Sequence, residues 1–181
     1  WLVAWERERD DAIAERHAEI SGGHEFAAPA GNFRLRGRAD RIDVRKDGRL
    51  EIYDFKTGAP PSARQVLTGL APQLALEVGM AHAGAFGDAF AGRSVTELAW
   101  LALGQAERGA PLKSAVERDW TADRLGQEAL TLLAGLIAAY DTEKRAYISR
   151  ARPMFEGRFE SPYDHLARVR EWRLIEATRD Q

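Results

Sequence analysis

Two acidic residues and a lysine are spaced so that they can meet at one point of a β-hairpin. Asp40 lies in one extended run, and Asp54 and Lys56 lie in the next, two positions apart. Because side chains on a strand alternate between faces, Asp54 and Lys56 leave the second strand on the same side. A turn near Gly48 brings Asp40 close to Asp54 across the hairpin. The sequence therefore predicts two carboxylates and one ammonium group at one spot.

This set of side chains suits a hard divalent cation. Two adjacent carboxylates repel each other, and a cation between them removes that repulsion. Oxygen ligands without His or Cys select Mg²⁺ or Mn²⁺, and Mg²⁺ takes one or two protein carboxylates and leaves other positions to water and phosphate. A lysine beside such an ion can hold a water and stabilise negative charge that develops at phosphorus. The chemistry that fits is phosphodiester hydrolysis.

The strands that position these residues are predicted from two extended runs, residues 33–44 and 50–56, joined by turn residues. A preceding strand over residues 17–26, broken by two glycines, completes a three-stranded antiparallel meander. Before it, residues 2–16 are interpreted as a helix.

Asp43 is a third acidic residue in the first strand of the hairpin. It lies an odd number of positions from Asp40, so on a regular strand it faces the other way. We interpret Asp43 as a structural anchor, paired to Arg41 or Arg45, rather than as a metal ligand.

Two helices are predicted after the hairpin. Ser62 with Gln65 three positions later is a capping box that begins a helix, and Pro72 is allowed in the first turn of a second helix that ends near Gly84. Gln65 and Gln73 are the polar residues expected to face the site. Gln73 is preferred, because a neutral amide can orient water or phosphate without adding charge.

The remaining elements complete an α/β fold. Residues 95–103 predict a fourth strand, which the intervening helix allows to lie parallel to another strand, and residues 112–120 predict an edge strand. Thr121 caps a helix that we expect to cover one face of the sheet. A last helix is expected to end near Trp172. The apolar positions of the Thr121 helix are Leu125, Ala129, Leu132 and Leu136.

Length and composition are those of a chain that buries a full core. The 181 residues are 45% hydrophobic, with no apolar run long enough to span a bilayer. We expect a core over residues 1–146 and a C-terminal loop and helix over residues 147–181 that pack on it. Because the chain begins with Trp rather than Met, we expect it to be an excised part of a larger protein.

The net charge of −2 argues against a protein that coats nucleic acid, but the charge is unevenly distributed. Residues 34–49 carry seven basic side chains against three acidic ones. Arginine binds phosphate well, so this segment is interpreted either as a basic rim around an acidic metal centre or as a solvated strand face. The basic residues are Arg34, Arg36, Arg38, Arg41, Arg45, Lys46 and Arg49.

Three segments read GRADRID at 37–43, YDFKTG at 53–58 and PQLALE at 72–77. Together they resemble the PD-(D/E)XK nuclease superfamily, in its RecB-like branch. With PPSARQV at 60–66 and a C-terminal segment that ends in REW, their order resembles more closely the C-terminal nuclease domain of the AddB family. Members of that family are subunits of bacterial helicase-nucleases that resect double-strand breaks.

The resemblance implies a restriction-endonuclease-like core with a central mixed sheet of four to five strands flanked by helices. It implies that Asp40 and Asp54 bind Mg²⁺ or Mn²⁺, with the backbone carbonyl of Phe55 as a further ligand. Lys56 then positions the attacking water, and Gln73 helps to orient the water or the phosphate. It also implies an exonuclease-type enzyme of the bacterial cytoplasm that acts on DNA with an AddA-like partner subunit and no membrane.

The sequence departs from its relatives in two ways. Many of them carry four Cys that hold an iron-sulfur cluster, and this chain has no Cys, so no cluster is expected. Relatives also place an early His or Glu in the metal shell, within a GTxxH-like segment that this chain lacks. That ligand lies upstream of Trp1, or its role falls to His17, Glu19 or His24, for which a surface position is the preferred interpretation.

Two other interpretations remain open. The first is a non-catalytic module of the same fold that holds single-stranded DNA or a partner subunit. The second is an unrelated β-rich domain in which the hairpin is coincidental. The chain contains no GxxxxGK[ST] segment, so any DNA unwinding belongs to other parts or partners.

Overall fold

The structure is a computed structural model that describes residues 1–103 and 112–147. The chain divides into two units, Trp1–Thr142 and Glu143–Gln181, and the helices and strands given below all belong to the first. The predicted division between residues 146 and 147 stays a prediction. The helix expected to end near Trp172 lies outside the described residues.

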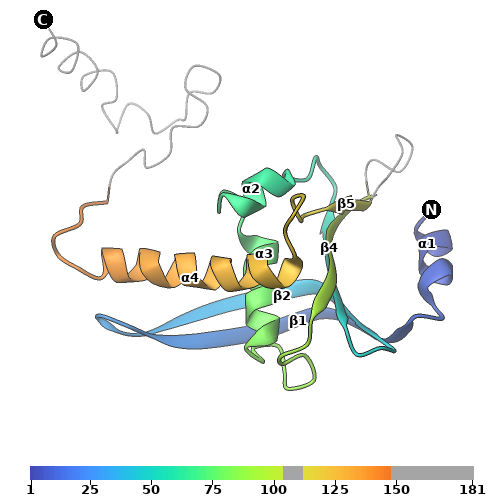
Figure 1. Ribbon diagram of the computed structural model, residues 1–181, viewed down its shortest axis with the longest axis horizontal. Coiled ribbons are helices and arrows are strands. Elements are labelled where there is room, and N and C mark those ends of the chain that lie inside the picture. Colours follow the sequence, from blue (N-terminus) through green and yellow to red (C-terminus); the bar gives the residue numbers. More distant parts are fainter. Residues whose placement is uncertain (104–111, 148–181) are drawn as a thin grey trace, which may run out of the picture. The chain divides into compact units, whose positions relative to one another are not determined.

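One mixed sheet forms the centre of the first unit (Figure 1). The first three strands form an antiparallel meander, the fourth lies parallel to the third, and the fifth lies antiparallel to the fourth. This confirms the predicted mixed sheet. In spatial order the strands are β1 (Ile13–Ala28), β2 (Gly31–Arg45), β3 (Leu50–Lys56), β4 (Val95–Ala102) and β5 (Leu112–Ser114).

Helices pack on both faces of the sheet. On one face, α3 and α4 cover a large apolar core to which Leu50 and Ile52 of β3 contribute. On the other face, Trp5 of α1 packs against Tyr53 and Phe55 of β3. The alternation predicted for β3 is therefore confirmed. The helices are α1 (Leu2–Arg9), α2 (Ala63–Leu67), α3 (Gln73–His82) and α4 (Ala122–Tyr140).

The start of the chain differs from the prediction. The first helix ends at Arg9, and β1 begins at Ile13 and runs through Gly22 and Gly23 to Ala28 without a break. A side chain at Gly22 would lie 2.4 Å from the carbonyl oxygen of Ala85, and the Gly23 N–H donates to the same oxygen at 3.2 Å. The glycines therefore let the loop after α3 approach the strand, and they do not break it.

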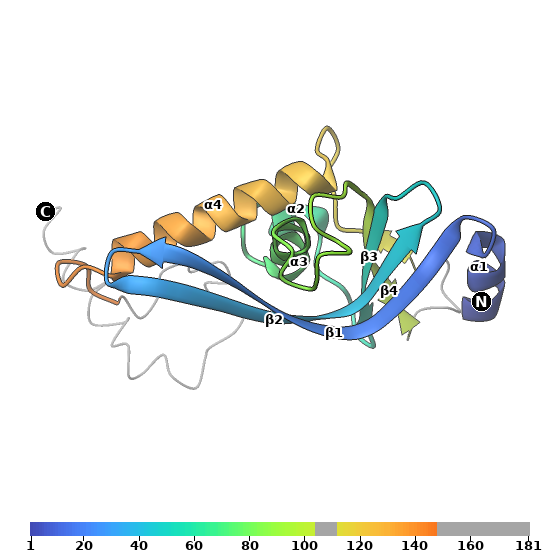
Figure 2. The same cartoon turned by 90° about the horizontal axis from the view of Figure 1, so that it is seen from below.

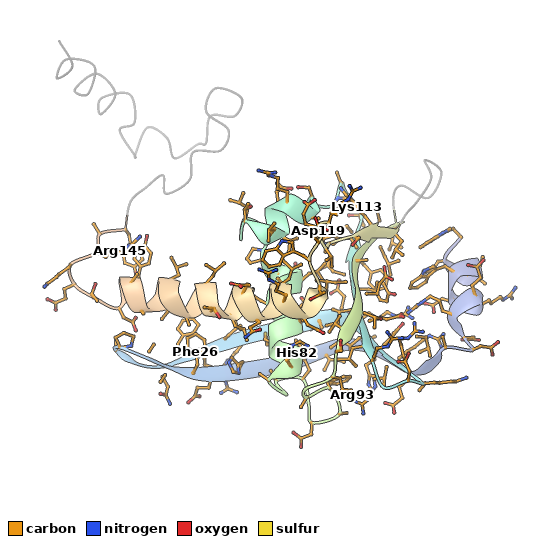
Figure 3. All side chains as sticks on the ribbon, in the orientation of Figure 1. Phe26, His82, Arg93, Lys113, Asp119 and Arg145 are labelled. Carbon is orange, nitrogen blue, oxygen red and sulfur yellow. The ribbon has the colours of Figure 1, made fainter. Side chains whose placement is uncertain are left out.

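Helix α4 begins after Thr121 as predicted, but it does not cover the sheet along its length. Its N-terminal half crosses α3 closely, because a Cβ on Gly126 would lie 2.8 Å from the Gly79 nitrogen. Nearby, His82 lies at the end of α3 (Figure 3), and its ring contacts Asp123 at 3.0 Å. Further along the helix, Leu132 and Leu136 are 59% and 51% exposed. The expectation that the apolar positions of this helix cover the sheet is therefore wrong at these two leucines.

The first two strands extend well past the rest of the sheet. Residues 21–28 of β1 pair with residues 31–38 of β2. This hairpin end, called the arm from here on, runs alongside α4 (Figure 2). At the arm's tip, the Ala30 N–H donates to the Asp141 carboxylate at the end of α4, over 3.1 Å. At the other edge of the sheet, β5 ends at Ser114, so the predicted edge strand is shorter than expected.

No helix in the described part of the chain is both long enough and apolar enough to cross a lipid bilayer.

Candidate active site

Asp54 and Lys56 lie on one face of β3, near its C-terminal end. Asp54 is 2% exposed and Lys56 is half-buried. The Lys56 Nζ lies 2.7 Å from Asp54 Oδ2, as an ion pair whose angles are not those of a hydrogen bond. The buried Oδ2 atom therefore has a cation beside it but no aligned hydrogen-bond donor.

Asp40 reaches the same end of β3 from the neighbouring strand. The pairing of β2 with β3 ends at Arg41 and Tyr53, and Asp40 and Asp54 are the next positions on the two strands. The Phe55 backbone N–H donates to Asp40 Oδ2 over 3.0 Å. Asp40 thus ties the two strands together where they separate. The ligand role of the Phe55 carbonyl stays a prediction.

The amide of Gln73 connects α3 to the strand. Gln73 is the first residue of the helix, and its Nε2 donates to Asp54 Oδ1 over 2.7 Å. The same nitrogen lies 3.1 Å from Oε1 of Glu77, one helical turn later. The amide therefore lies between two carboxylates, and its direction is set by both.

Glu77 is a buried carboxylate that the sequence analysis did not assign to the site. It is 4% exposed, and its Oε2 atom has no hydrogen-bond partner among the described residues. Burial, together with the nearby Asp54 and Asp40, raises its pKa to about 8, and the hydrogen bond from Gln73 and the charge of Lys56 oppose this rise. Its spacing of four from Gln73 is the sequence signal that could have identified it.

The donor set fits a divalent cation that keeps part of its water shell. The carboxyl groups of Asp40, Asp54 and Glu77 lie close enough for Asp40 and Asp54 to affect the pKa of Glu77, Lys56 pairs with Asp54, and two of the buried oxygens lack an aligned donor. Within residues 1–103 and 112–147, no three His, Asp or Glu side chains are grouped closely enough to enclose a metal ion. Mg²⁺ is bound in this way, by one or two carboxylates together with water and phosphate.

Other candidate residues have different partners. Gln65 accepts from the Ser62 N–H over 2.8 Å within the capping box of α2, so the expectation that it faces the site is wrong. His17 contacts Glu15 at 2.8 Å, Glu19 lies 3.5 Å from Arg38, and the ring of His24 packs on Phe26. In the described part of the chain, no hydrogen bond or ion pair joins these four residues to Asp54 or Lys56.

An ion network on the opposite face holds the strands in register. Asp43 is fully buried and accepts from Arg41 Nε over 2.7 Å and from Arg9 of α1 over 2.8 Å. This confirms Asp43 as a structural anchor paired to Arg41. Glu6 of α1 also pairs with Arg41, and Glu51 of β3 with Arg9. The contribution of α1 was not predicted, because it depends on contacts between distant parts of the chain.

Comparison with known proteins gives a family match and several partial relatives. A family model described as PD-(D/E)XK nuclease superfamily matches residues 1–148. Uncharacterized proteins of Rickettsia typhi, Rickettsia bellii and Rickettsia conorii are 34%, 32% and 31% identical to the chain over 76 residues. The aligned residues make up 42% of this chain and 9% of each relative. The chain therefore corresponds to a small part of the length of these relatives.

Proposed function

Because this chain belongs to the PD-(D/E)XK nuclease superfamily, we propose that it is a metal-dependent deoxyribonuclease that hydrolyses phosphodiester bonds. The observation that supports this most directly is that Lys56 and Gln73 both contact the buried carboxylate of Asp54. A buried acid with both an ammonium and an amide directed at it has little structural purpose in an apolar core, because such groups are costly to bury.

The residues have separate tasks in this proposal. Asp40 and Asp54 hold Mg²⁺ or Mn²⁺, with the Phe55 carbonyl as a further ligand, and the ion supplies positive charge next to the phosphate when bound. Lys56 holds the attacking water by a hydrogen bond from Nζ and adds positive charge where the phosphate becomes more negative. Gln73 fixes the Asp54 carboxylate by its bond to Oδ1.

The biological setting that we propose is the resection of DNA double-strand breaks by an exonuclease in the bacterial cytoplasm. The support is the order of segments that the chain shares with the AddB family, from GRADRID through PQLALE. An AddA-like helicase-nuclease subunit is the proposed partner, and DNA is the substrate.

The second candidate function is a non-catalytic module that binds single-stranded DNA or a partner subunit. One observation favours it: α1 packs on the far face of the sheet, and no early His or Glu in the described part of the chain contacts Asp54 or Lys56. The third interpretation, an unrelated β-rich domain, is wrong because the family match extends over residues 1–148.

The decisive experiment is the degradation of end-labelled DNA with Mg²⁺, with Mn²⁺ or with EDTA. The unmodified chain is compared with Lys56→Ala and with Lys46→Ala, a matched control at an exposed turn lysine. Circular dichroism checks that each variant is folded. Cleavage that requires metal, is lost in Lys56→Ala and persists in Lys46→Ala establishes the nuclease. If the folded wild type binds DNA but never cuts it with either metal, the binding module replaces the nuclease.

A further inference from the structure

Three arginines occupy alternate positions on the outer surface of the arm. Arg34, Arg36 and Arg38 are exposed, whereas Phe33 and Leu35 between them are half-buried. The half-buried side is the inner face of the arm, where Phe33 packs on Phe26 at 5.4 Å between ring centres. Two strand residues rise about 6.6 Å, so the guanidinium groups form a regular row on one face of β2. We call these three residues the arginine row.

Most of the positive charge in the arginine row is not neutralised within the protein. Among the described residues, neither Arg34 nor Arg36 makes an ion pair, and Arg38 has only an exposed contact with Glu19 at 3.5 Å. Glu25 lies opposite Arg34 in the ladder, but it accepts a hydrogen bond from Asn32 over 2.8 Å.

The β1 residues that pair with Arg36 and Arg38 have small side chains. Gly23 and Ser21 are the ladder partners of Arg36 and Arg38. A Cβ on Gly23 would lie 3.2 Å from Arg34 Nε, so the Arg34 side chain extends over the bare glycine. The outer face of the arm therefore presents arginines over small side chains, which is a surface that a polyanion can approach closely.

The arginine row ends two residues before Asp40, on the face of the sheet that points away from α3. A Cβ on Gly37 would lie 3.3 Å from Met80 Sδ of α3, and Ala39 belongs to the apolar core under that helix, so Arg38 faces the other way. The candidate active site lies on the α3 face, where Gln73 contacts Asp54. Asp40 contacts the Phe55 N–H at the point where β2 and β3 separate. Arg34 lies six strand residues from Asp40, or about 20 Å, so the row extends from the rim of the site outward along the outer face of the arm.

We propose that the arginine row binds the phosphate backbone of the DNA substrate outside the active site, along the outer face of the arm. This inference rests on the proposed nuclease function and adds the surface that guides the substrate. Arginine suits the task because its planar guanidinium binds phosphate oxygens in pairs and stays charged at all relevant pH values. Contacts of this kind position a nucleic acid without reading its sequence.

The test measures DNA binding separately from cleavage. Affinity for a 30-nucleotide single strand and for a 30-base-pair duplex is measured in EDTA over a range of salt concentrations. The triple variant Arg34→Gln, Arg36→Gln, Arg38→Gln is compared with the wild type. The matched control is Arg7→Gln, Lys46→Gln, Arg118→Gln, which removes the same charge from exposed positions elsewhere.

Each phosphate contact contributes roughly 0.7–0.9 to the slope of log affinity against log salt. We expect the triple variant to reduce that slope by about 2–3 and to weaken binding roughly 10–100-fold at 0.1 M salt. The single variant Arg36→Gln should lose about a third of the slope change. The DNA form that loses more affinity identifies whether a single strand or a duplex lies on the arm. An unchanged slope in the folded triple variant, or an equal loss in the control, overturns the inference.

A small phosphodiester substrate separates this inference from the proposed function. Hydrolysis of bis(4-nitrophenyl) phosphate needs the metal and Lys56 but not the arm, so the triple variant should hydrolyse it at the wild-type rate while its KM for long DNA rises. If the wild type hydrolyses neither substrate, the nuclease proposal fails, and the salt slopes still decide whether the arginine row binds DNA.

Discussion

The side-chain amide of Gln73 donates to Asp54 Oδ1 over 2.7 Å and joins the start of α3 to a strand residue 19 positions earlier. A carboxylate held by one donor on one oxygen presents the other oxygen in a fixed direction. The direction of Asp54 Oδ2 therefore depends on where α3 is packed, and not only on β3.

Removing this amide should impair the site without unfolding the protein. Gln73→Ala leaves Asp54 Oδ1 without its donor, and residues that orient a metal ligand typically contribute 10–100-fold to metal affinity or activity. We expect a decrease of that size in the turnover of DNA and in the affinity for Mn²⁺ measured by calorimetry. Gln65→Ala is the control, because Gln65 caps α2, and it should leave turnover unchanged. Equal effects of the two variants would show that Gln73 has no special role.

Glu77 should make stability depend on pH. Its pKa is raised from 4.5 to about 8, so the folded protein keeps a proton that the unfolded chain loses. The free energy of unfolding therefore decreases as pH rises between about 4.5 and 8 and stays low above that range. Glu77→Gln has no such proton and still accepts from Gln73, so it should be more stable than the wild type at pH 8 by about 1–3 kcal/mol. Urea unfolding in EDTA at pH 5, 6.5 and 8 tests this, and parallel pH profiles would contradict it.

Divalent metal should stabilise the folded chain through Asp54. A ligand at one hundred times its dissociation constant adds about 2.7 kcal/mol to the free energy of unfolding. We expect Mn²⁺ to raise the wild-type melting temperature and EDTA to reverse the change. Asp54→Asn, which keeps the side-chain shape, should lose the response, whereas Asp88→Asn in an exposed loop should keep it. A full response in Asp54→Asn would place the ion elsewhere.

The buried carboxylate of Asp43 should be essential for stability. Asp43→Ala removes the fully buried carboxylate that Arg41 and Arg9 share, so each keeps only its pair with Glu6 or Glu51, and breaking a buried ion pair costs about 3–5 kcal/mol. The exposed Asp47, which pairs with Arg49, provides the control, and Asp47→Ala should change stability little. Urea unfolding monitored by tryptophan fluorescence compares them. Similar midpoints for the two variants would show that the network contributes little.

Two glycines of α4 should respond in opposite directions to the same substitution. A Cβ on Gly126 would lie 2.6 Å from Val78 Cγ1, so Gly126→Ala should force the helices apart and cost roughly 1–3 kcal/mol. Gly135 has no atom within 4 Å of an added Cβ, and Gly135→Ala should stabilise the helix by up to about 1 kcal/mol. Thermal melting of both variants checks the prediction. Destabilisation by both would mean that helix contact is not the cause.

The predictable features were those that depend on neighbours in sequence. Strand alternation is a local property, and β3 follows it, with Leu50 and Ile52 on the face opposite Tyr53. The capping box at Ser62 is contained within four residues and was also correct. The site residues themselves were predicted by spacing and by resemblance, and their chemical roles stay predictions.

The features that sequence reasoning missed depend on distant partners. Gly22 was interpreted as a break in a strand. In the structure, its missing side chain lets the loop at Ala85 pack against the strand, and no local pattern in the sequence reveals that contact. Leu132 and Leu136 have the spacing of a buried face, but spacing does not show how far the partner helix extends. Glu77 was overlooked because it lies among apolar residues and a charged residue there usually marks a helix surface.

The parallel pairing of β3 with β4 has a consequence for how the protein folds. The meander of β1, β2 and β3 closes through short turns, whereas β3 and β4 are separated in the chain by the segment that contains α2 and α3. Contacts between distant residues form slowly, because the intervening chain must first lose its freedom. The hairpin with Asp40 and Asp54 can therefore form early, while Gln73 and Glu77 arrive with the slow step. Refolding followed by stopped-flow should show hairpin signals before the recovery of metal affinity, so the protein becomes competent only at the end of folding.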